Sequence, residues 1–300
     1  MARTKRNEKI NKKAEDDNFI MSPKIDFAFK LLFGDSKNIE LLKALLCAIL
    51  NVEESAFNDL RIINNELPRQ FAEDKKGILD VRAKTKDDKE LDIEIQIIST
   101  DYMAERTTFY WSKMYTSQIK SGDTYDKLKK CITINILDFE CIPLNKLHTS
   151  YHITEDETNY RLTETLEIHY LELPKLNNKD VEKDENADIT QWMEFIGTES
   201  KGVMEMLAAK NKEIKKAYNE LQIISKDEKA RMAYEAREAE IHDQKTKIKT
   251  AREEGMKEGI KRGIKEGKID IARNLLDVLD DETIALKTGF SIEEIKKLRK

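Results

Sequence analysis

The chain has 300 residues, enough for two domains, and its 39% hydrophobic content suffices for one core but is lean for the whole length. Charged residues make up 37% of the chain while the formal net charge is only −5, so no overall basic field indicates a nucleic-acid-binding protein. The sequence has no run of about 18 apolar residues that could span a membrane, and no apolar signal segment follows the charged amino terminus.

The cysteines indicate a reducing environment. Cys47, Cys131 and Cys141 are widely spaced in apolar surroundings, which favours reduced core thiols over a disulfide framework. We therefore expect a soluble, cytoplasmic protein without a membrane partner.

The amino-terminal residues 1–20 are charged and poor in aromatic residues, which is typical of a disordered basic arm. Its basic side chains are candidates for a DNA contact, and the alternative is a solvated tail. These side chains are Arg3, Lys5, Arg6, Lys9, Lys12 and Lys13.

Two helices are predicted after the arm. Ser22 followed by Pro23 is typical of an N-cap with proline at the first helical position, and the first helix ends at Gly34. A second helix begins one or two residues later and ends at Asn51. Its apolar residues recur at helical spacing and predict a core-facing side: Leu41, Leu42, Leu45, Ile49 and Leu50.

A β-hairpin is predicted from residues 78–83 and 91–97, joined through residues 85–89. If the apolar faces of the two strands coincide, Asp80 lies opposite Glu94 on the other face. Two carboxylates in that arrangement repel each other, so a bound divalent cation would explain the pair.

The sequence beyond the hairpin completes a mixed sheet covered by helices. An amphipathic helix is predicted over 104–120, and strands at 132–136, 151–154 and 166–173. Together these elements predict an α/β nuclease-like domain over residues 21–190.

The remainder is predicted to be helical and charged, as a region over 191–254 and a glycine-repeat helix with a helical cap over 255–300. A short coiled-coil-like seam is formed by Ile214, Ala217, Leu221 and Ile224. Gly255, Gly259, Gly263 and Gly267 repeat every four residues, which indicates a soluble helix pair or a flexible linker. Residues 281–298 predict a helix, a glycine turn and a helix, and two early glutamates favour a structural cap over DNA reading.

The polar side of the hairpin has the residues that phosphodiester cleavage needs. Asp80, Glu94 and the main-chain carbonyl of Ile95 could hold Mg²⁺ or Mn²⁺, which provides a hydroxide nucleophile and neutralises phosphate charge. Gln96 could orient the attacking water but cannot serve as a base. The alternative is a solvated face whose charges pair across the strands.

Several motifs in a fixed order carry a family resemblance: SPKIDFAFKLLFG at 22–34, ILDVRA at 78–83, IEIQ at 93–96, YWSKMY at 110–115 and LELPK at 171–175, with Arg106 and Gln118. Over about residues 20–280 the chain resembles the Rpn family of recombination-promoting nucleases, also described as PD-(D/E)XK nuclease family transposases. The resemblance implies a restriction-endonuclease-like core and metal-dependent DNA endonuclease activity. It also implies that Asp80 and Glu94 are metal ligands, and that Gln96 stands where the wider superfamily usually has a catalytic lysine.

Further candidates for the site are Asp26 and Glu40 on the early helices and Gln118 after the helix that follows the hairpin. A carboxylate on an early helix is more often a helix-dipole partner or part of a solvated face. Tyr110 is expected to pack in the core.

The sequence thus favours a Mg²⁺-dependent DNA endonuclease with little sequence preference, linked to recombination or mobile elements and working as a homodimer through the helices beyond residue 190. No organic cofactor is expected. Two alternatives stay open: an interaction protein that keeps a nuclease fold, and a nuclease that acts on RNA, since metal-assisted hydrolysis does not distinguish the sugars.

Overall fold

The computed structural model describes residues 19–67 and 77–299, which form two compact units divided between Ile241 and His242. The predicted basic arm lies almost entirely outside the described residues. Its last two residues, Phe19 and Ile20, pack against the core of the first unit.

A six-stranded mixed sheet is the centre of the first unit, with the order β1-β4-β5-β6-β8-β7. The middle strands β5, β6 and β8 are parallel, and antiparallel strands extend the sheet at both ends. The strands are β1 Arg61–Ile62, β4 Val81–Lys84, β5 Glu90–Gln96, β6 Cys131–Leu137, β7 His148–Tyr151 and β8 Leu166–Glu172, with a separate pair of β2 Glu66–Leu67 and β3 Gly77–Ile78. The predicted mixed α/β fold is confirmed.

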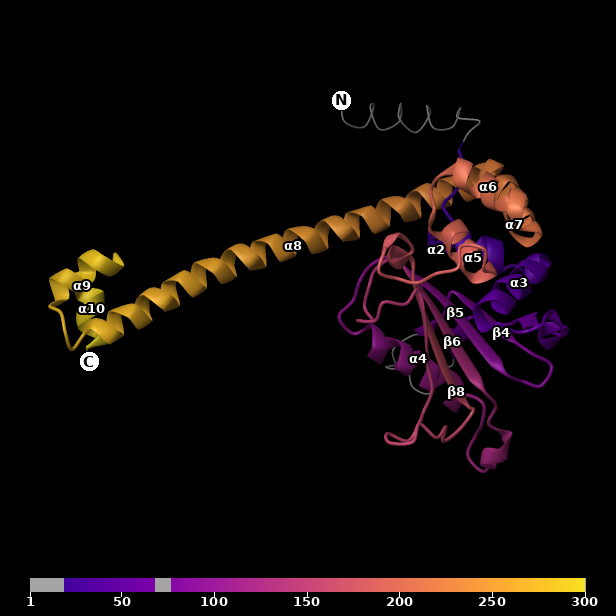
Figure 1. Cartoon of the computed structure of the whole chain (residues 1–300), viewed down its shortest axis with the longest axis horizontal. Coiled ribbons are helices and arrows are strands. Elements are labelled where there is room, and N and C mark those ends of the chain that lie inside the picture. The colour runs from indigo at the N-terminus through magenta and orange to yellow at the C-terminus, as the bar shows by residue number, and fades with distance from the viewer. Residues whose placement is uncertain (1–18, 68–76, 300) are drawn as a thin grey trace. The chain divides into compact units, whose positions relative to one another are not determined.

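Helices cover both faces of this sheet (Figure 1). On one face α4 packs through Met103 against β6 and β8, and on the other the apolar residues of β5 and β6 share one core with α2, α3, α5 and α7. The α-helices of the first unit are α2 Asp26–Phe33, α3 Ile39–Leu50, α4 Met103–Thr116, α5 Asp188–Gly197, α6 Lys201–Lys210 and α7 Lys212–Lys226, followed by α8 Glu228–Leu275. Short 3-10 helices are η1 Ser36–Asn38, η2 Glu54–Phe57, η3 Tyr125–Lys127 and η4 Leu173–Asn177.

The ends of the early helices agree only in part with the sequence analysis. Ser22 was predicted as an N-cap, which is wrong: its carbonyl accepts a hydrogen bond from Ile25 N at 3.2 Å, closing a turn before the helix begins at Asp26. The predicted ends are confirmed at Gly34 and at Asn51, which adopts the left-handed conformation with φ of 52°.

Two later elements are shifted from their predicted positions. The edge strand β7 spans His148–Tyr151 rather than 151–154, and Thr154 makes only an isolated bridge to Arg161. The helix predicted to reach residue 120 ends at Thr116. The strand shift follows from pairing with β8, in which His148 lies opposite Leu171.

The core of the first unit continues past residue 190, where the sequence analysis ended the nuclease-like domain. Trp192 and Phe195 of α5 are buried in the same core as the sheet. The short seam with coiled-coil-like spacing is buried there too: Ile214, Ala217, Leu221 and Ile224. These α7 residues therefore stabilise their own unit.

The second unit contains the end of α8, then α9 Asp281–Thr288 and α10 Ile292–Leu298. Ala272, Ile284 and Ile295 form its buried core. Gly289 joins the two short helices with φ of 75°, a conformation that favours glycine, and a capping box at Ser291 begins α10. The predicted helix, glycine turn and helix are confirmed. Throughout the described ranges, no helix has the length and apolarity that a membrane crossing requires.

Candidate active site

The hairpin of β4 and β5 brings two of the predicted acidic residues together. Val81 pairs with Ile93 and Arg82 with Asp92, so Asp80, one residue before β4, lies opposite Glu94 as predicted. Asp80 N donates to Glu94 Oε1 at 2.9 Å, and Ile95 N donates to Asp80 Oδ2 at 2.9 Å. Each carboxylate is therefore held by main chain of the other strand.

Glu94 also accepts hydrogen bonds from two side chains that flank it. Gln96 Nε2 and Arg106 Nη2 donate to Glu94 Oε2 at 3.2 Å and 3.3 Å. Arg106 comes from α4, and its guanidinium lies 4.8 Å from the ring centre of Tyr110, a buried residue of a smaller core, as expected. The structure thus places Gln96 beside Glu94, as the alternation along the strand predicts.

A lysine from α2 completes the charged cluster. Lys30 Nζ lies 2.8 Å from Asp80 Oδ1. It also lies 3.9 Å from Oδ2 of Asp26, which precedes Lys30 by one turn of α2. The Asp26 carboxylate accepts hydrogen bonds from Arg237 Nε at 2.8 Å and 3.1 Å. Sequence reasoning missed Lys30, although the polar pair Asp26 and Lys30 on an otherwise apolar helix was a signal for a buried charge partner.

Burial makes this cluster electrostatically costly. Desolvation, followed by the charge of Asp80, raises the pKa of Glu94 to about 7 in spite of Arg106. Desolvation also raises the pKa of Asp80 above its ordinary value in spite of Lys30. Asp92, behind Glu94 on the same face, is fully buried, and neither of its carboxylate oxygens has a hydrogen-bond partner in the described part of the chain.

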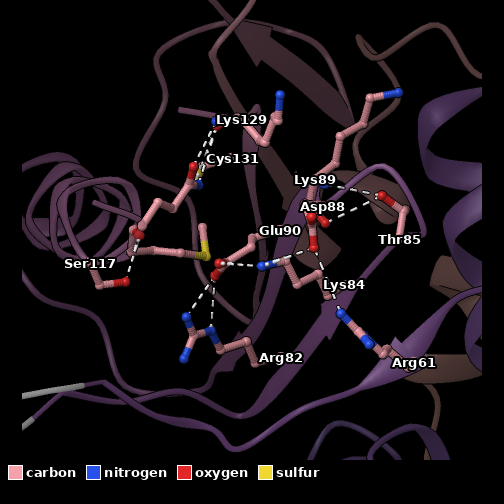
Figure 2. Close-up of polar contacts among 12 residues, drawn as sticks. Arg61, Arg82, Lys84, Thr85, Asp88, Lys89, Glu90, Ser117, Lys129 and Cys131 are labelled. Carbon is pink, nitrogen blue, oxygen red and sulfur yellow. Dashed lines mark hydrogen bonds and ion pairs between the residues drawn. The ribbon is translucent and has the colours of Figure 1, made fainter. Parts of the chain in front are cut away.

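At the opposite end of the hairpin, the acidic residue Glu90 is paired with basic side chains (Figure 2). Arg82 contacts Glu90 diagonally across the strands, with Arg82 Nη2 and Glu90 Oε2 2.6 Å apart, and Lys84, which lies opposite Glu90, has its Nζ 3.6 Å from the other oxygen. The expected cross-paired face therefore exists at this end. Because Asp92 and Glu94 are buried, the polar face of β5 is not a solvated surface.

Two further candidates lie away from this cluster. Glu40 forms an ion pair with Lys43 on α3, with 2.8 Å between the charged atoms. Gln118 donates from Nε2 to the carbonyl of Lys129 at 3.2 Å and to Cys131 Sγ at 2.9 Å, so it fixes the start of β6. The structure does not bring either side chain to Asp80 and Glu94.

The donor set fits a hard divalent cation. Asp80 and Glu94 offer carboxylate oxygens, the ligand type that such a cation prefers, and a cation would cancel the repulsion between the two carboxylates. Nowhere in residues 19–67 and 77–299 are three or more His, Cys, Asp or Glu side chains arranged to hold a metal ion. A cation here would therefore depend on two carboxylates, main chain, and water or substrate oxygens, as is usual for Mg²⁺.

Comparisons with known proteins agree with this geometry. No curated protein and no solved structure matched the chain. A family model described as PD-(D/E)XK nuclease family transposase matches residues 23–251, which include every element of the hairpin cluster. The chain therefore belongs to the PD-(D/E)XK nuclease family transposases.

Proposed function

We propose that this protein is a Mg²⁺- or Mn²⁺-dependent endonuclease that hydrolyses DNA phosphodiester bonds with little sequence specificity, in recombination or the movement of mobile elements. The observation that carries the proposal is the Asp80 and Glu94 pair: two buried carboxylates with raised pKa values, each accepting a main-chain hydrogen bond from the other strand, in a member of a nuclease family. Such an accumulation of unstable charge is typical of a functional site.

In the proposed mechanism the hairpin supplies the ligands and the orientation. Asp80, Glu94 and the carbonyl of Ile95 would hold the cation, which when bound supplies an activated water and neutralises charge on the scissile phosphate. Arg106 fixes the Glu94 carboxylate through its 3.3 Å contact. Gln96 donates one N–H to Glu94 and keeps its amide oxygen as an acceptor that can orient the attacking water.

The test offers the purified protein supercoiled plasmid and a single-stranded RNA, each with Mg²⁺, with Mn²⁺ and with EDTA. We expect nicking or linearisation of the plasmid that needs the metal. Cleavage of RNA alone would replace DNA as the substrate. Absence of cleavage on both would favour the alternative of an interaction protein on a nuclease fold.

We further propose that two copies pair through α8, so that two sites can address two strands. An apolar stripe of Met256, Ile260, Ile264 and Ile271 follows one side of the helix, and each of these side chains is between 54% and 68% exposed. The glycines beside the stripe leave room for close approach, because a Cβ added at any of them would have no described atom within 4 Å apart from the chain neighbours and nearby backbone of its own helix. A partner helix would offset the helix-destabilising cost of these glycines, about 1 kcal/mol each.

We also propose a cytoplasmic location, as the cysteines suggest. All three cysteines, Cys47, Cys131 and Cys141, are free thiols. Burial raises the pKa of Cys131 to about 12, so that this thiol stays protonated and unreactive at neutral pH. Free cysteines of this kind are typical of a reducing compartment.

A further inference from the structure

Cleavage of a phosphodiester places negative charge on the phosphate and on the leaving oxygen, and a positioned cationic side chain lowers the energy of that state. The strand position at which the wider superfamily usually has a lysine holds Gln96 here, whose amide is neutral and already donates to Glu94. A cationic side chain that assists the metal at the phosphate would therefore come from another element.

Two basic side chains contact the acidic pair, and they differ in freedom. Arg106 donates from Nη2 to Glu94, its guanidinium lies over the Tyr110 ring, and its side chain is 32% exposed. Lys30 contacts the other carboxylate through a single atom, with Nζ 2.8 Å from Asp80 Oδ1, and its side chain is 36% exposed. The two side chains are about equally exposed, so what distinguishes Lys30 is that its ammonium contacts the pair at Asp80 Oδ1 without the ring contact that holds Arg106.

The base of Lys30 is fixed while its ammonium remains adjustable. Phe29 and Phe33 on the neighbouring positions of α2 are fully buried, and Gly34 ends the helix where a Cβ would lie 2.7 Å from the Lys30 carbonyl oxygen. An ammonium has three N–H donors, of which Asp80 uses one. The others can reach a phosphate oxygen while the cation-binding carboxylate remains in place.

We propose that Lys30 of α2 is the catalytic lysine of this protein, contacting the scissile phosphate from a helix in place of the strand residue Gln96. The assignment rests on the proposed nuclease function and names a residue of that same site. Its competing explanation is a purely structural one, in which Lys30 only neutralises Asp80.

The two explanations differ in what Lys30→Met does to metal binding. A lysine that contacts phosphate should cost about 100-fold or more in cleavage rate when removed, the magnitude seen for other transition-state donors. Because Lys30 competes with a cation for Asp80, its loss should leave Mn²⁺ affinity unchanged or increase it. If Lys30 has only a structural role, it is needed to keep the Asp80 and Glu94 carboxylates in place. Lys30→Met would then weaken Mn²⁺ binding together with cleavage.

The experiment measures plasmid cleavage and, by calorimetry, Mn²⁺ binding for the wild type, Lys30→Met and the control Lys37→Met. Lys37 lies at the surface just beyond α2, with Nζ 3.1 Å from Glu220 Oε1, and its replacement removes the same charge away from the site. We expect loss of cleavage with intact Mn²⁺ binding in Lys30→Met, and wild-type cleavage and Mn²⁺ binding in the control.

Wild-type cleavage by Lys30→Met, or joint loss of cleavage and Mn²⁺ binding, would overturn the assignment while leaving the nuclease proposal standing. If the wild type itself cleaves neither plasmid nor RNA, the proposed function fails and the assignment fails with it.

Discussion

Glu94 is the residue at which burial and charge oppose each other most strongly. Its side chain is only 3% exposed and it shares the site with Asp80, and these surroundings raise its pKa to about 7. A residue with those properties reduces stability at neutral pH in order to keep a cation-binding oxygen in place. This arrangement is more typical of a site than of a scaffold.

The raised pKa of Glu94 predicts a pH dependence of stability in buffer without divalent metal. The unfolded chain releases this proton near the ordinary value of 4.5, while the folded protein keeps it to about 7. Between these values the unfolded state binds fewer protons, so the free energy of unfolding falls as the pH rises, by on the order of 3 kcal/mol from this group.

Urea unfolding of the wild type and of Glu94→Gln at pH 5 and pH 8 checks this. The glutamine keeps the hydrogen-bonding shape without the ionisable group, so the variant should lose less stability between the two pH values. Equal losses in both proteins would show that Glu94 ionises in the folded state as it does in the unfolded state.

At the scale of the elements, the register of the hairpin could be predicted from sequence because two independent constraints agree. Apolar residues alternate in both strands, and the five-residue connection at 85–89 allows only a narrow range of registers. The alternation and the short connection together place Asp80 opposite Glu94. Lys30 could not be placed in this way, because its contact with Asp80 depends on how α2 packs on the sheet, which periodicity along one helix does not determine.

The limits of β7 and the role of the α7 seam could not be predicted from the sequence, for physical reasons. The edge strand β7 is short, and with polar residues such as His148 and Ser150 it has no apolar alternation to mark its limits. The seam of α7 was ambiguous, because a stripe at helical spacing suits a coiled coil and a domain core equally. Only the packing against α2 and α3 decides between them.

That packing predicts the effect of shortening a seam residue. Leu221 of α7 is fully buried, so Leu221→Ala should lower the free energy of unfolding by about 2–5 kcal/mol. Ile223, two residues further on and 64% exposed, is the matched control. Ile223→Ala should change the free energy of unfolding by less than about 0.5 kcal/mol. Urea unfolding at two protein concentrations measures both. A loss for Leu221→Ala that depends on concentration would return the seam to an interface between copies.

At the scale of the whole molecule, the sequence correctly predicted a mixed sheet followed by a long helix and a helical cap. The compact first unit nevertheless extends to Ile241, because α5 to α7, though rich in charge, each bury one apolar face in the sheet's own core. Composition indicated charged helices there but did not show which of them belong to the core.

The proposed pairing through α8 is a property of the assembled molecule. The double variant Ile260→Lys with Ile264→Lys would place two positive charges on each copy's side of the interface. It should therefore be a monomer while the wild type is a dimer. Lys261→Gln changes the charge of the adjacent position and should leave the dimer intact. Light scattering after gel filtration measures the masses, and a wild-type monomer, or a double variant that remains a dimer, would remove the stripe from the interface.

The most direct test of the account is cleavage of supercoiled plasmid by the wild type and by Asp80→Ala, each with Mg²⁺ and with EDTA. Asp80 is the acidic residue that Ile95 N and Lys30 hold at the open end of the hairpin, so its removal should take away a cation ligand without opening the core. We predict nicked or linear plasmid with the wild type in Mg²⁺ and none in the other three reactions. Equal cleavage by Asp80→Ala, in a preparation free of other nucleases, would contradict the assignment of the hairpin carboxylates as the nuclease site.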